Sequence, residues 1–363
     1  MKFLFLEPFF GGSHRDFALG LKEYSSHGID LVTLPAKFWK WRMQGAALSF
    51  SKIVKNLDIY DGIIATDMMN LSDFIALAGP AIPPVLVYFH ENQFTYPLSN
   101  GEKMNYQFGI TNMTTALCAD KVIFNSEFHR NEFFSGVAKY TNTRPDARTA
   151  WVKDEIEKKS EVIYPGCRFS PGKNSPDLPD LSPVSPPLIV WNHRWEYDKN
   201  PEEFFKALKI IKKKGVKFRL ALLGEHCSVI PKLFKEAGEF FKEEVEVFGY
   251  AESRQEYFNW LKKGAVVVST SIQENFGISV VEAVRMGCIP LLPDRLSYPE
   301  IMPKEHVNDV IYVTFEDLVD KLETLLQQYQ KFFPLKKSLS ASMAKYSWEV
   351  LIREYDVVLE RLA

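Results

Sequence analysis

The sequence has few of the features that mark disulfide-rich, zinc-binding or membrane-spanning proteins. Its 363 residues include four cysteines, which are far apart and form no C-x-x-C pair, so a disulfide framework or a zinc site is disfavoured. No apolar run approaches the roughly 18 residues that a membrane-spanning helix needs. The net charge is only −2, so any contact with RNA has to come from a local basic patch.

The amino-terminal stretch MKFLFLEPFFGG also lacks the signs of a signal peptide. Its apolar run is short, Glu7 interrupts it early, and no small-residue cleavage site follows. We therefore interpret this stretch as a first buried strand, and we expect a soluble, cytoplasmic protein.

Short apolar runs alternate with amphipathic stretches along most of the chain, which predicts an α/β fold. A Pro-rich segment, 169–187, interrupts this alternation and is typical of a linker or an exposed loop. The strands predicted before this segment are 2–7, 29–34, 62–66, 85–90, 121–125 and 161–165. The strands predicted after it are 188–193, 217–224, 245–249, 265–270, 288–293 and 309–313.

This repeated alternation predicts two doubly wound, Rossmann-like domains. We expect the first over 1–180 and the second over 181–345. An amphipathic helix over 346–363 follows, and it can pack back on the first domain. Ligands of such sheets bind beyond the carboxyl ends of the strands. Two sheets that face each other therefore predict a central cleft as the substrate site.

The segment AVVVSTSIQENFGISVVEAVRMGCIPLL reads as a strand, a loop, a helix and another strand. Glu274 lies in the loop, Gly277 lies before the helix, and Glu282 lies within it. The first turn of the helix offers unpaired N–H groups and the positive end of the helix dipole to a diphosphate. Glu282 is suited to a ribose diol and Glu274 to a sugar hydroxyl. The alternative is a pair of surface glutamates on an amphipathic helix.

These residues resemble the signature of the retaining glycosyltransferases of family four, which have the GT-B fold. The matching pattern is Glu-x7-Glu with an embedded Asn-Phe-Gly, followed by Glu-Ala and Gly-Cys-Ile-Pro. Asn275 stands where the family has glycine. The resemblance implies a donor site that includes Glu274, Asn275, Phe276, Gly277, Ile278 and Glu282.

Two cations follow the first predicted strand of the second domain. Arg194 and Lys199 are placed to neutralise a leaving diphosphate without a metal ion. The resemblance agrees, because the family has an arginine and a lysine at this spacing; the alternative is a pair of solvated charges at a helix start. We find no D-x-D motif, so we expect no metal, and no cofactor besides the sugar-nucleotide substrate.

The segment EPFFGGSHRDF predicts a strand, a turn at Gly11 and Gly12, and a helix with Ser13 as its N-cap. Such a turn lets a donor phosphate approach the backbone, and the alternative is simply a tight turn. The segment does not match G-x-G-x-x-G, which disfavours a nicotinamide cofactor.

His90 closes the strand 85–90, where active-site side chains of this architecture lie. The resemblance implies that it contacts the donor sugar near the reacting centre, which makes it a catalytic candidate with Arg194, Lys199 and Glu274. Asn92 follows in the same loop. Asn125 and Ser126 end another strand, where they either cap a helix or line the acceptor side.

The stretch LPAKFWKWRMQG interleaves cations with aromatic rings: Lys37, Trp39, Lys40, Trp41 and Arg42. Such a stretch can stack on unpaired bases and hold phosphates. The alternative is that the tryptophans belong to the core and the cations are solvated.

The Gly-Gly-Ser-His turn, which ends at His14, and the Trp-Lys-Trp-Arg-Met run narrow the resemblance to the tRNA-queuosine mannosyltransferase family, over nearly the whole chain. That family implies transfer of mannose from GDP-mannose to the cyclopentene diol of queuosine at the tRNA wobble position. The acceptor or RNA side would then comprise Ser13, His14, Lys37, Trp39, Lys40, Trp41, Arg42, Asn92, Asn125 and Ser126.

Two other functions stay open at this point. The first is a family-four enzyme with another sugar nucleotide and a lipid, glycan or small-molecule acceptor. The second is a non-catalytic RNA-binding protein on a GT-B scaffold, which the intact set of Arg194, Lys199, Glu274 and Glu282 argues against. The residues leave the choice between GDP and UDP, the sugar epimer and the oligomeric state open.

Overall fold

The computed structural model describes residues 1–97, 104–143, 146, 149–169, 185–224 and 230–363. The chain divides into two compact units, of which unit 1 is Met1–Gly166 with Trp348–Ala363 and unit 2 is Cys167–Ser347. The sequence places this boundary at 180, and most of the Pro-rich segment, 170–184, lies outside the described residues. Among the helices described, none has both the length and the apolar composition that crossing a bilayer requires.

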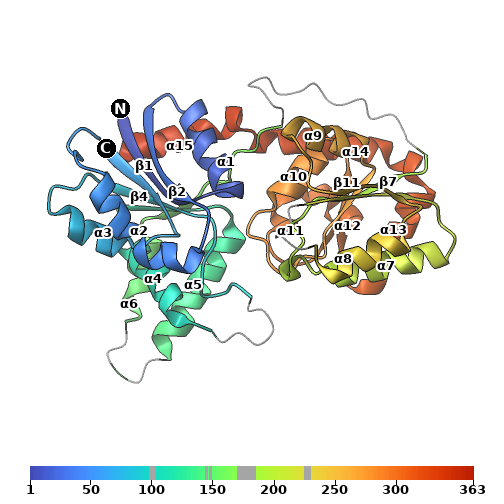
Figure 1. Ribbon diagram of the computed structural model, residues 1–363, viewed down its shortest axis with the longest axis horizontal. Coiled ribbons are helices and arrows are strands. Elements are labelled where there is room, and N and C mark those ends of the chain that lie inside the picture. Colours follow the sequence, from blue (N-terminus) through green and yellow to red (C-terminus); the bar gives the residue numbers. More distant parts are fainter. Residues whose placement is uncertain (98–103, 144–145, 147–148, 170–184, 225–229) are drawn as a thin grey trace. The chain divides into compact units, whose positions relative to one another are not determined.

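Unit 1 is built on a six-stranded parallel sheet with the order β2-β1-β3-β4-β5-β6 (Figure 1). Every residue of β3 and β4 is buried, as the continuous apolar runs GIIAT and VLVYF predict for strands covered on both faces. The strands are β1 Lys2–Phe10, β2 Gly28–Pro35, β3 Gly62–Thr66, β4 Val85–Phe89, β5 Lys121–Phe124 and β6 Ser160–Val162.

The helices of unit 1 cover the sheet, and its last helix comes from the end of the chain. α15 packs against α1 and β4, and the buried Trp348 at its start lies where a Cβ at Gly20 or Gly166 would come within 2.2 Å of its ring. The helices are α1 Gly12–Tyr24, α2 Trp39–Ile53, α3 Leu71–Ala78, α4 Tyr106–Cys118, α5 Glu127–Asn142, α6 Trp151–Glu157 and α15 Trp348–Leu362.

Unit 2 has a second six-stranded parallel sheet, with the order β12-β11-β10-β7-β8-β9. Its strands are β7 Leu188–Trp191, β8 Arg219–Leu223, β9 Val245–Gly249, β10 Val266–Val268, β11 Ile289–Pro293 and β12 Ile311–Tyr312. Its α-helices are α7 Pro201–Lys213, α8 Lys232–Phe240, α9 Arg254–Lys263, α10 Ile278–Arg285, α11 Tyr298–Ile301, α12 Val307–Val310, α13 Phe315–Gln327 and α14 Phe333–Ser342. Short 3-10 helices span Tyr197–Lys199, Lys304–His306, Tyr329–Phe332 and Met343–Tyr346.

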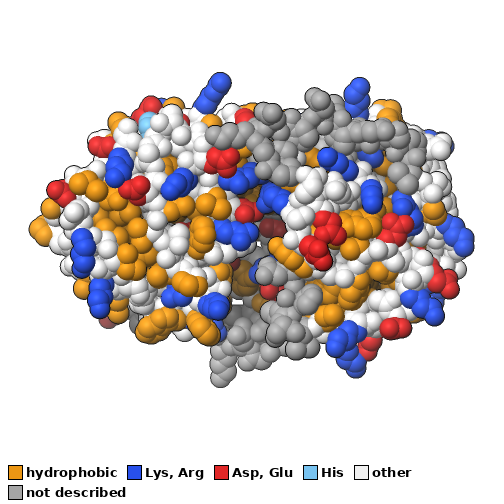
Figure 2. Space-filling model, turned by 45° about the horizontal axis from the view of Figure 1, so that its top comes forward, with side chains coloured by type: hydrophobic (Ala, Val, Ile, Leu, Met, Phe, Trp, Pro, Cys, Tyr) orange, Lys and Arg blue, Asp and Glu red, His pale blue; other side chains and the backbone are white. Residues whose placement is uncertain are grey.

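Each strand predicted from the sequence overlaps an observed strand, although β6, β10 and β12 are shorter than predicted. Both sheets are parallel, so the predicted doubly wound α/β class is confirmed. The surface carries charges of both signs: on the face drawn in Figure 2, Lys and Arg side chains are mixed with Asp and Glu over each unit. This mixture accords with the small net charge. A basic surface therefore has to be found from particular residues.

Candidate active site

The polar residues of unit 2 gather where its sheet reverses strand order. From β7 the chain adds β8 and β9 on one side and then returns to place β10 on the other side. The carboxyl ends of β7 and β10 therefore border the switch point, where open α/β sheets bind their ligands. Residues 192–194 follow β7 and residues 269–274 follow β10, so the topology brings the two predicted motifs of this domain together.

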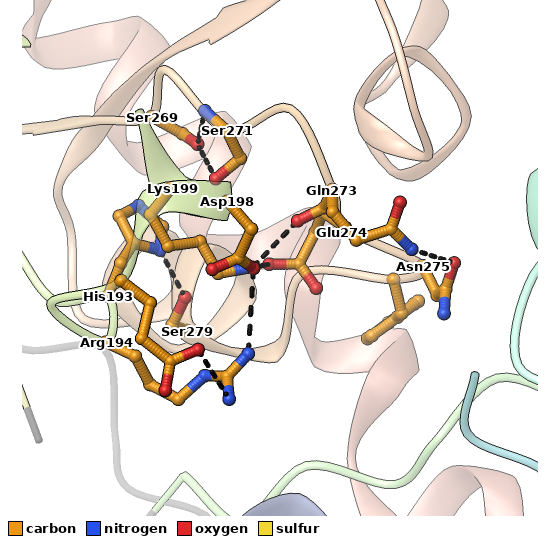
Figure 3. Close-up of polar contacts among 12 residues, drawn as sticks. His193, Arg194, Asp198, Lys199, Ser269, Ser271, Gln273, Glu274, Asn275 and Ser279 are labelled. Carbon is orange, nitrogen blue, oxygen red and sulfur yellow. Dashed lines mark hydrogen bonds and ion pairs between the residues drawn. The ribbon is translucent and has the colours of Figure 1, made fainter. Parts of the chain in front are cut away.

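Lys199 is the centre of this cluster (Figure 3). Its Nζ donates to the carbonyl oxygen of Gln273 at 2.7 Å and lies 3.3 Å from Glu274 Oε2. It also lies 3.2 Å from Asp198 Oδ2, and the side chain of Asp198 is only 1% exposed. Lys199 thus ties the β7 segment to the loop of Glu274 and fixes a positive charge at the switch point.

Arg194 joins the same carboxylate from the solvent side. Its Nη2 lies 3.6 Å from Asp198 Oδ2 (Figure 3). Its Nη1 lies 3.1 Å from Glu196 Oε2. Its side chain is 48% exposed. The structure therefore brings the predicted pair of cations, Arg194 and Lys199, onto the shared carboxylate of Asp198, and leaves the guanidinium accessible to an incoming anion.

The start of α10 lies beside this cluster. Gly277 precedes the helix with a φ of 97°, in the left-handed region that glycine adopts without strain. His193 Nδ1 and Ser279 Oγ lie 3.1 Å apart and connect the end of β7 to the first turn of the helix. Burial, with Lys199 nearby, lowers the pKa of His193 to about 3. The imidazole is therefore neutral, and the groups suited to receive an anion here are the N–H groups of the helix start.

Glu282 belongs to a different group of contacts from Glu274. Its Oε1 accepts from Arg254 Nη2 at 2.7 Å, and its Oε2 accepts from the hydroxyl of Tyr257 at 2.9 Å. Asn192 Nδ2 donates to that same tyrosine oxygen at 3.0 Å. Burial and the neighbouring Glu282 raise the pKa of Tyr257 well above its usual value, so the tyrosine remains a hydrogen-bond donor. Both carboxylate oxygens of Glu282 are thereby held in a fixed orientation.

The residues between the two glutamates support the loop. Asn275 accepts from Gln273 Nε2 at 3.1 Å and is buried, so the amide that replaces the family's glycine braces the loop. The ring of Phe276 is 2% exposed and packs edge-on against Tyr346, with centroids 5.1 Å apart. A ligand at this point would therefore meet the backbone of Phe276 and not its side chain. Ile278 is half-buried in the first turn of α10.

In unit 1 the strand order reverses beside β1, and polar residues gather at that point as well. Glu7 in β1 is fully buried, and its Oε1 lies 3.3 Å from Nδ1 of His14, which is in α1. The imidazole of His14 stacks on that of His90, with centroids 3.8 Å apart. Asp67 follows β3 and accepts from the backbone N–H of His90 at 2.7 Å. The predicted residues His14 and His90 are thus in contact.

Burial and charge set the protonation of these groups. Burial alone would lower the pKa of His14, but the acidic groups around it, chiefly Glu7, together outweigh burial and raise the pKa to about 9. Burial, with the charge on His14, lowers the pKa of His90 well below 6.5, and burial raises the pKa of Asp67 to about 8. At neutral pH the cluster therefore holds a cationic His14 against a neutral His90 and a protonated Asp67.

Glu7, His14 and His90 have potential metal-ligand atoms within 4.8 Å of one another. Their arrangement fits a hydrogen-bonded stack better than a metal site. His14 Nδ1 already contacts Glu7, and two stacked imidazoles direct their in-plane lone pairs side by side instead of toward one point.

The glycine turn differs from the expectation at one residue. α1 begins at Gly12 with Gly11 as its N-cap and without a side-chain cap, so the prediction that Ser13 caps the helix is wrong. Ser13 lies exposed in the first turn instead. A Cβ at Gly11 would come within 2.4 Å of Ala36, so glycine is needed there for packing. A role of Gly11 and Gly12 in donor binding stays a prediction.

Three predicted acceptor residues have local structural contacts. Ser126 caps α5 by accepting from the N–H of His129 at 2.9 Å. Asn125 donates to the carbonyl of His90 at 3.0 Å, and so holds the strand end that carries His90. Asn92 is buried and accepts from the N–H of Phe94 at 3.1 Å within a turn.

The two tryptophans of the Lys37–Arg42 stretch have different surroundings. Trp39 is half-buried and packs on Phe108, with centroids 5.1 Å apart. Trp41 is 59% exposed, and Lys37 and Lys40 are exposed as well. Arg42 Nε donates to the carbonyl of Pro35 at 3.2 Å. Of the two tryptophans, only Trp39 packs against other hydrophobic side chains, as the alternative that places them in the core requires.

Several residues of both clusters were missed by the sequence analysis. Arg254 and Tyr257 lie on α9, and no spacing rule connects them with Glu282. Asp198 stands between Arg194 and Lys199, but a carboxylate between two cations looks like an ordinary surface charge. Glu7 did carry a signal, since a charged residue inside an apolar strand run is unusual.

Comparison with known proteins places the chain in a family. Residues 2–167 match the family described as tRNA-queuosine alpha-mannosyltransferase N-terminal, and residues 179–346 match that described as glycosyl transferases group 1. The Drosophila melanogaster protein named tRNA-queuosine alpha-mannosyltransferase is 34% identical over 330 residues, which are 88% of this chain and 85% of that protein.

Solved structures share the fold at low sequence identity. Sucrose-phosphate synthase from Thermosynechococcus elongatus superimposes with a TM-score of 0.75 at 14% identity, over 100% of this chain and 99% of the other. HepE from Anabaena, solved in complex with UDP and glucose, gives a TM-score of 0.68 at 17% identity, over 99% and 100%. These similarities confirm the GT-B fold. With one third of its residues identical to the Drosophila protein over most of both chains, the chain belongs to the tRNA-queuosine alpha-mannosyltransferase family of glycosyltransferases.

Proposed function

We propose that this enzyme transfers mannose from GDP-mannose to queuosine at the wobble position of tRNA, with retention of configuration and without a metal ion. One observation carries the donor half of the proposal: the cations of Arg194 and Lys199 meet at the switch point of unit 2, beside the start of α10. The acceptor half is supported by the family to which the chain belongs.

The donor diphosphate would be held by Arg194, Lys199 and the N–H groups at the start of α10. A diphosphate in this position would replace Asp198 as the partner of Arg194, because the guanidinium is the exposed member of the cluster. The ribose would bind Glu282, whose carboxylate Arg254 and Tyr257 already orient. Glu274, held by Lys199, would accept a hydrogen bond from a sugar hydroxyl.

Departure of the diphosphate leaves an oxocarbenium-like sugar, so stabilising the leaving charge is the main catalytic task. The acceptor hydroxyl would attack from the face that the diphosphate leaves, and the leaving phosphate would take its proton. His90 would contact the sugar near the reacting carbon. As a neutral imidazole it can hydrogen-bond a sugar hydroxyl without opposing the positive charge that develops there.

The acceptor would be bound by unit 1. The residues that we propose for it are Ser13, His14, Lys37, Trp39, Lys40, Trp41, Arg42, Asn92, Asn125 and Ser126, of which the exposed cations and Trp41 have the character of an RNA-binding surface. A tRNA substrate would also place the enzyme in the cytoplasm, where mature tRNA is used.

The decisive experiment incubates the enzyme with GDP-mannose and queuosine-containing tRNA, followed by mass analysis of the nucleosides. We expect queuosine to gain one hexose, with and without EDTA. The matched controls are the same tRNA without queuosine, and UDP-glucose as donor. A gain with UDP-glucose alone would revise the donor, loss of transfer in EDTA would overturn the metal-free mechanism, and release of GDP without a modified nucleoside would overturn the acceptor.

A further inference from the structure

Phe38, which precedes α2, combines two unfavourable properties. Its backbone is left-handed, with φ of 54° and ψ of 57°, a conformation that is disfavoured for a residue with a bulky side chain. Its ring is 79% exposed, the largest fraction among the large hydrophobic side chains that the structure describes. Neither property contributes to the folding of unit 1. Outliers of this kind tend to occur where the structure holds a residue ready for a ligand.

The turn around Phe38 is held in place by its neighbours. Lys37 N donates to the carbonyl of Pro35 at 2.8 Å, and the side chain of Arg42 donates to that same carbonyl. The carbonyl of Phe38 accepts from the N–H of Trp41 at 2.8 Å, as the first bond of α2. The left-handed conformation is therefore fixed on both sides, and the ring of Phe38 is kept in solvent.

Trp41 presents a second exposed ring on the first turn of α2. A Cβ at Gly45 would come within 3.0 Å of the Trp41 indole, so the absence of a side chain at Gly45 lets the indole lie against the helix. The remainder of the indole is open to solvent. Lys37 and Lys40 lie beside the two rings in sequence and are exposed.

The charge around these rings has one sign. Residues 31–57 contain no Asp or Glu, in a chain that otherwise has an acidic residue about every eight positions. The same residues include five cations, which are Lys37, Lys40, Arg42, Lys52 and Lys55. The segment is therefore a local basic region in a protein whose net charge is −2, and it complements a polyanion.

We propose that Phe38 and Trp41 form a stacking platform for unpaired bases of an RNA loop, with Lys37 and Lys40 contacting its phosphates. Aromatic rings stack on any base, and cations on either side follow the backbone. An apolar or basic peptide partner would account for the rings but not for the absence of acidic residues. The proposal rests on the proposed function for the identity of the RNA, and it adds Phe38 as a residue that binds the substrate away from the reacting atoms.

The test measures binding of an unmodified anticodon stem-loop RNA by fluorescence anisotropy, at low and at physiological salt. Phe38→Ala and Trp41→Ala should each weaken binding by about 5- to 150-fold, the change expected from losing one stacked base. Lys37→Glu with Lys40→Glu should weaken binding and reduce its salt dependence. The matched controls are Leu48→Ala, exposed on the same helix, and Tyr250→Ala, an exposed ring of unit 2, and both should bind as wild type.

Phe38→Gly separates binding from folding. Glycine adopts the left-handed conformation without strain, so this variant should unfold at the same or a higher temperature than wild type and yet bind RNA as weakly as Phe38→Ala. Wild-type RNA affinity in Phe38→Gly overturns the proposal. Binding of the wild type to anionic vesicles, without binding to the RNA, overturns it in favour of a membrane partner.

The two proposals fail in different ways. If mannose is transferred normally and Phe38→Ala leaves the apparent KM for tRNA unchanged, the stacking platform is wrong and the proposed function stands. If the RNA binds through Phe38 but queuosine gains no hexose, the platform stands and the proposed function is wrong.

Discussion

The two switch points of this protein balance their charges in different ways. In unit 2 the buried carboxylate of Asp198 has two cations beside it, and one of them, Arg194, is half exposed. In unit 1 the carboxyl groups of Glu7 and Asp67 are almost fully enclosed, and the cation beside Glu7 is the buried imidazole of His14. The first arrangement can exchange a carboxylate for a diphosphate, whereas the second depends on where its protons lie.

The two units of this fold are thus suited to different tasks. Ion pairs at a partly open edge are suited to bind and release a charged substrate, because each cation keeps a partner in either state. A buried cluster of imidazole and carboxyl groups is suited to hold one neutral imidazole, His90, in a fixed position.

Removal of the exposed cation of unit 2 should reduce turnover most. Arg194→Ala should lower kcat for hexose transfer by about 10²- to 10³-fold with a small change in the donor KM, because its guanidinium is proposed to stabilise charge on the leaving diphosphate. Steady-state kinetics with the mannose donor measure both constants. Lys262→Ala, an exposed cation on α9, is the control. Wild-type turnover in Arg194→Ala would remove this cation from the mechanism.

The free energy of unfolding should decrease as the pH rises above 6.5, because of the buried titratable groups of unit 1. The pKa of His14 is raised to about 9 and that of Asp67 to about 8, so the folded state binds more protons than the unfolded state between pH 6.5 and 8. The stabilisation from His14 is fully present below pH 6.5 and is lost as the pH rises to about 9, whereas that from Asp67 is fully present below pH 3.8 and is lost as the pH rises to about 8. Each extra proton contributes about 1.4 kcal/mol per pH unit.

Urea unfolding between pH 6.5 and 9 measures this slope. His14→Gln should flatten it by about one proton, and His306→Gln, in unit 2, should leave it unchanged. On the acid side the sign reverses, because burial lowers the pKa of His129 and of His193 to about 3, and both therefore lose stabilisation as the pH falls below 6.5. A slope in His14→Gln equal to that of wild type would contradict the cationic His14.

Glu282, the carboxylate that is proposed to bind the ribose, should affect binding of the donor more than the rate of the chemical step. Glu282→Ala should raise the apparent KM for the donor roughly tenfold or more, because hydrogen bonds to a charged group contribute about 1.5–3 kcal/mol, and kcat should change little. Tyr257→Phe keeps the carboxylate but removes one of its hydrogen-bond donors, so its KM should rise less. If the loss in Glu282→Ala falls on kcat alone, Glu282 acts at the reacting centre and the ribose assignment is wrong.

The smallest effect separates a structural role of Ser126 from its proposed role on the acceptor side. Ser126→Ala should lower the free energy of unfolding by about 1 kcal/mol, the usual contribution of an N-cap, whereas contact with the acceptor would also raise the apparent KM for tRNA. Ser126→Asp keeps a cap and should restore stability. A raised KM for tRNA in both variants, at wild-type stability, would instead place Ser126 on the acceptor side.

How well each site could be predicted depends on whether its residues lie close together along the chain. The donor motifs lie on contiguous strand–loop–helix segments, so their spacing predicts which residues share one edge, and the contacts of Lys199 with Glu274 follow that spacing. The prediction that Ser13 caps α1 was wrong by two residues, because the backbone turns into the helix already at Gly11, where a side chain would clash with Ala36.

Other residues had no signal in the sequence. Trp39 and Trp41 are two residues apart and chemically alike, yet one packs on Phe108 and the other is exposed, because residues at this spacing point to different sides of a helix. The left-handed backbone of Phe38 could not be predicted either, since only neighbouring contacts make a phenylalanine adopt it.

The strands, the parallel class and the donor motifs could be predicted from the chain alone, because apolar runs and loop spacings are local features. The partners of these motifs depend on the folded structure. It placed Arg254 and Tyr257 on Glu282, Asp198 between two cations, and Glu7 against His14. The protonation of His14 and His90 also belongs to the folded state, because burial and neighbouring charge exist only once the strands of the sheet are assembled.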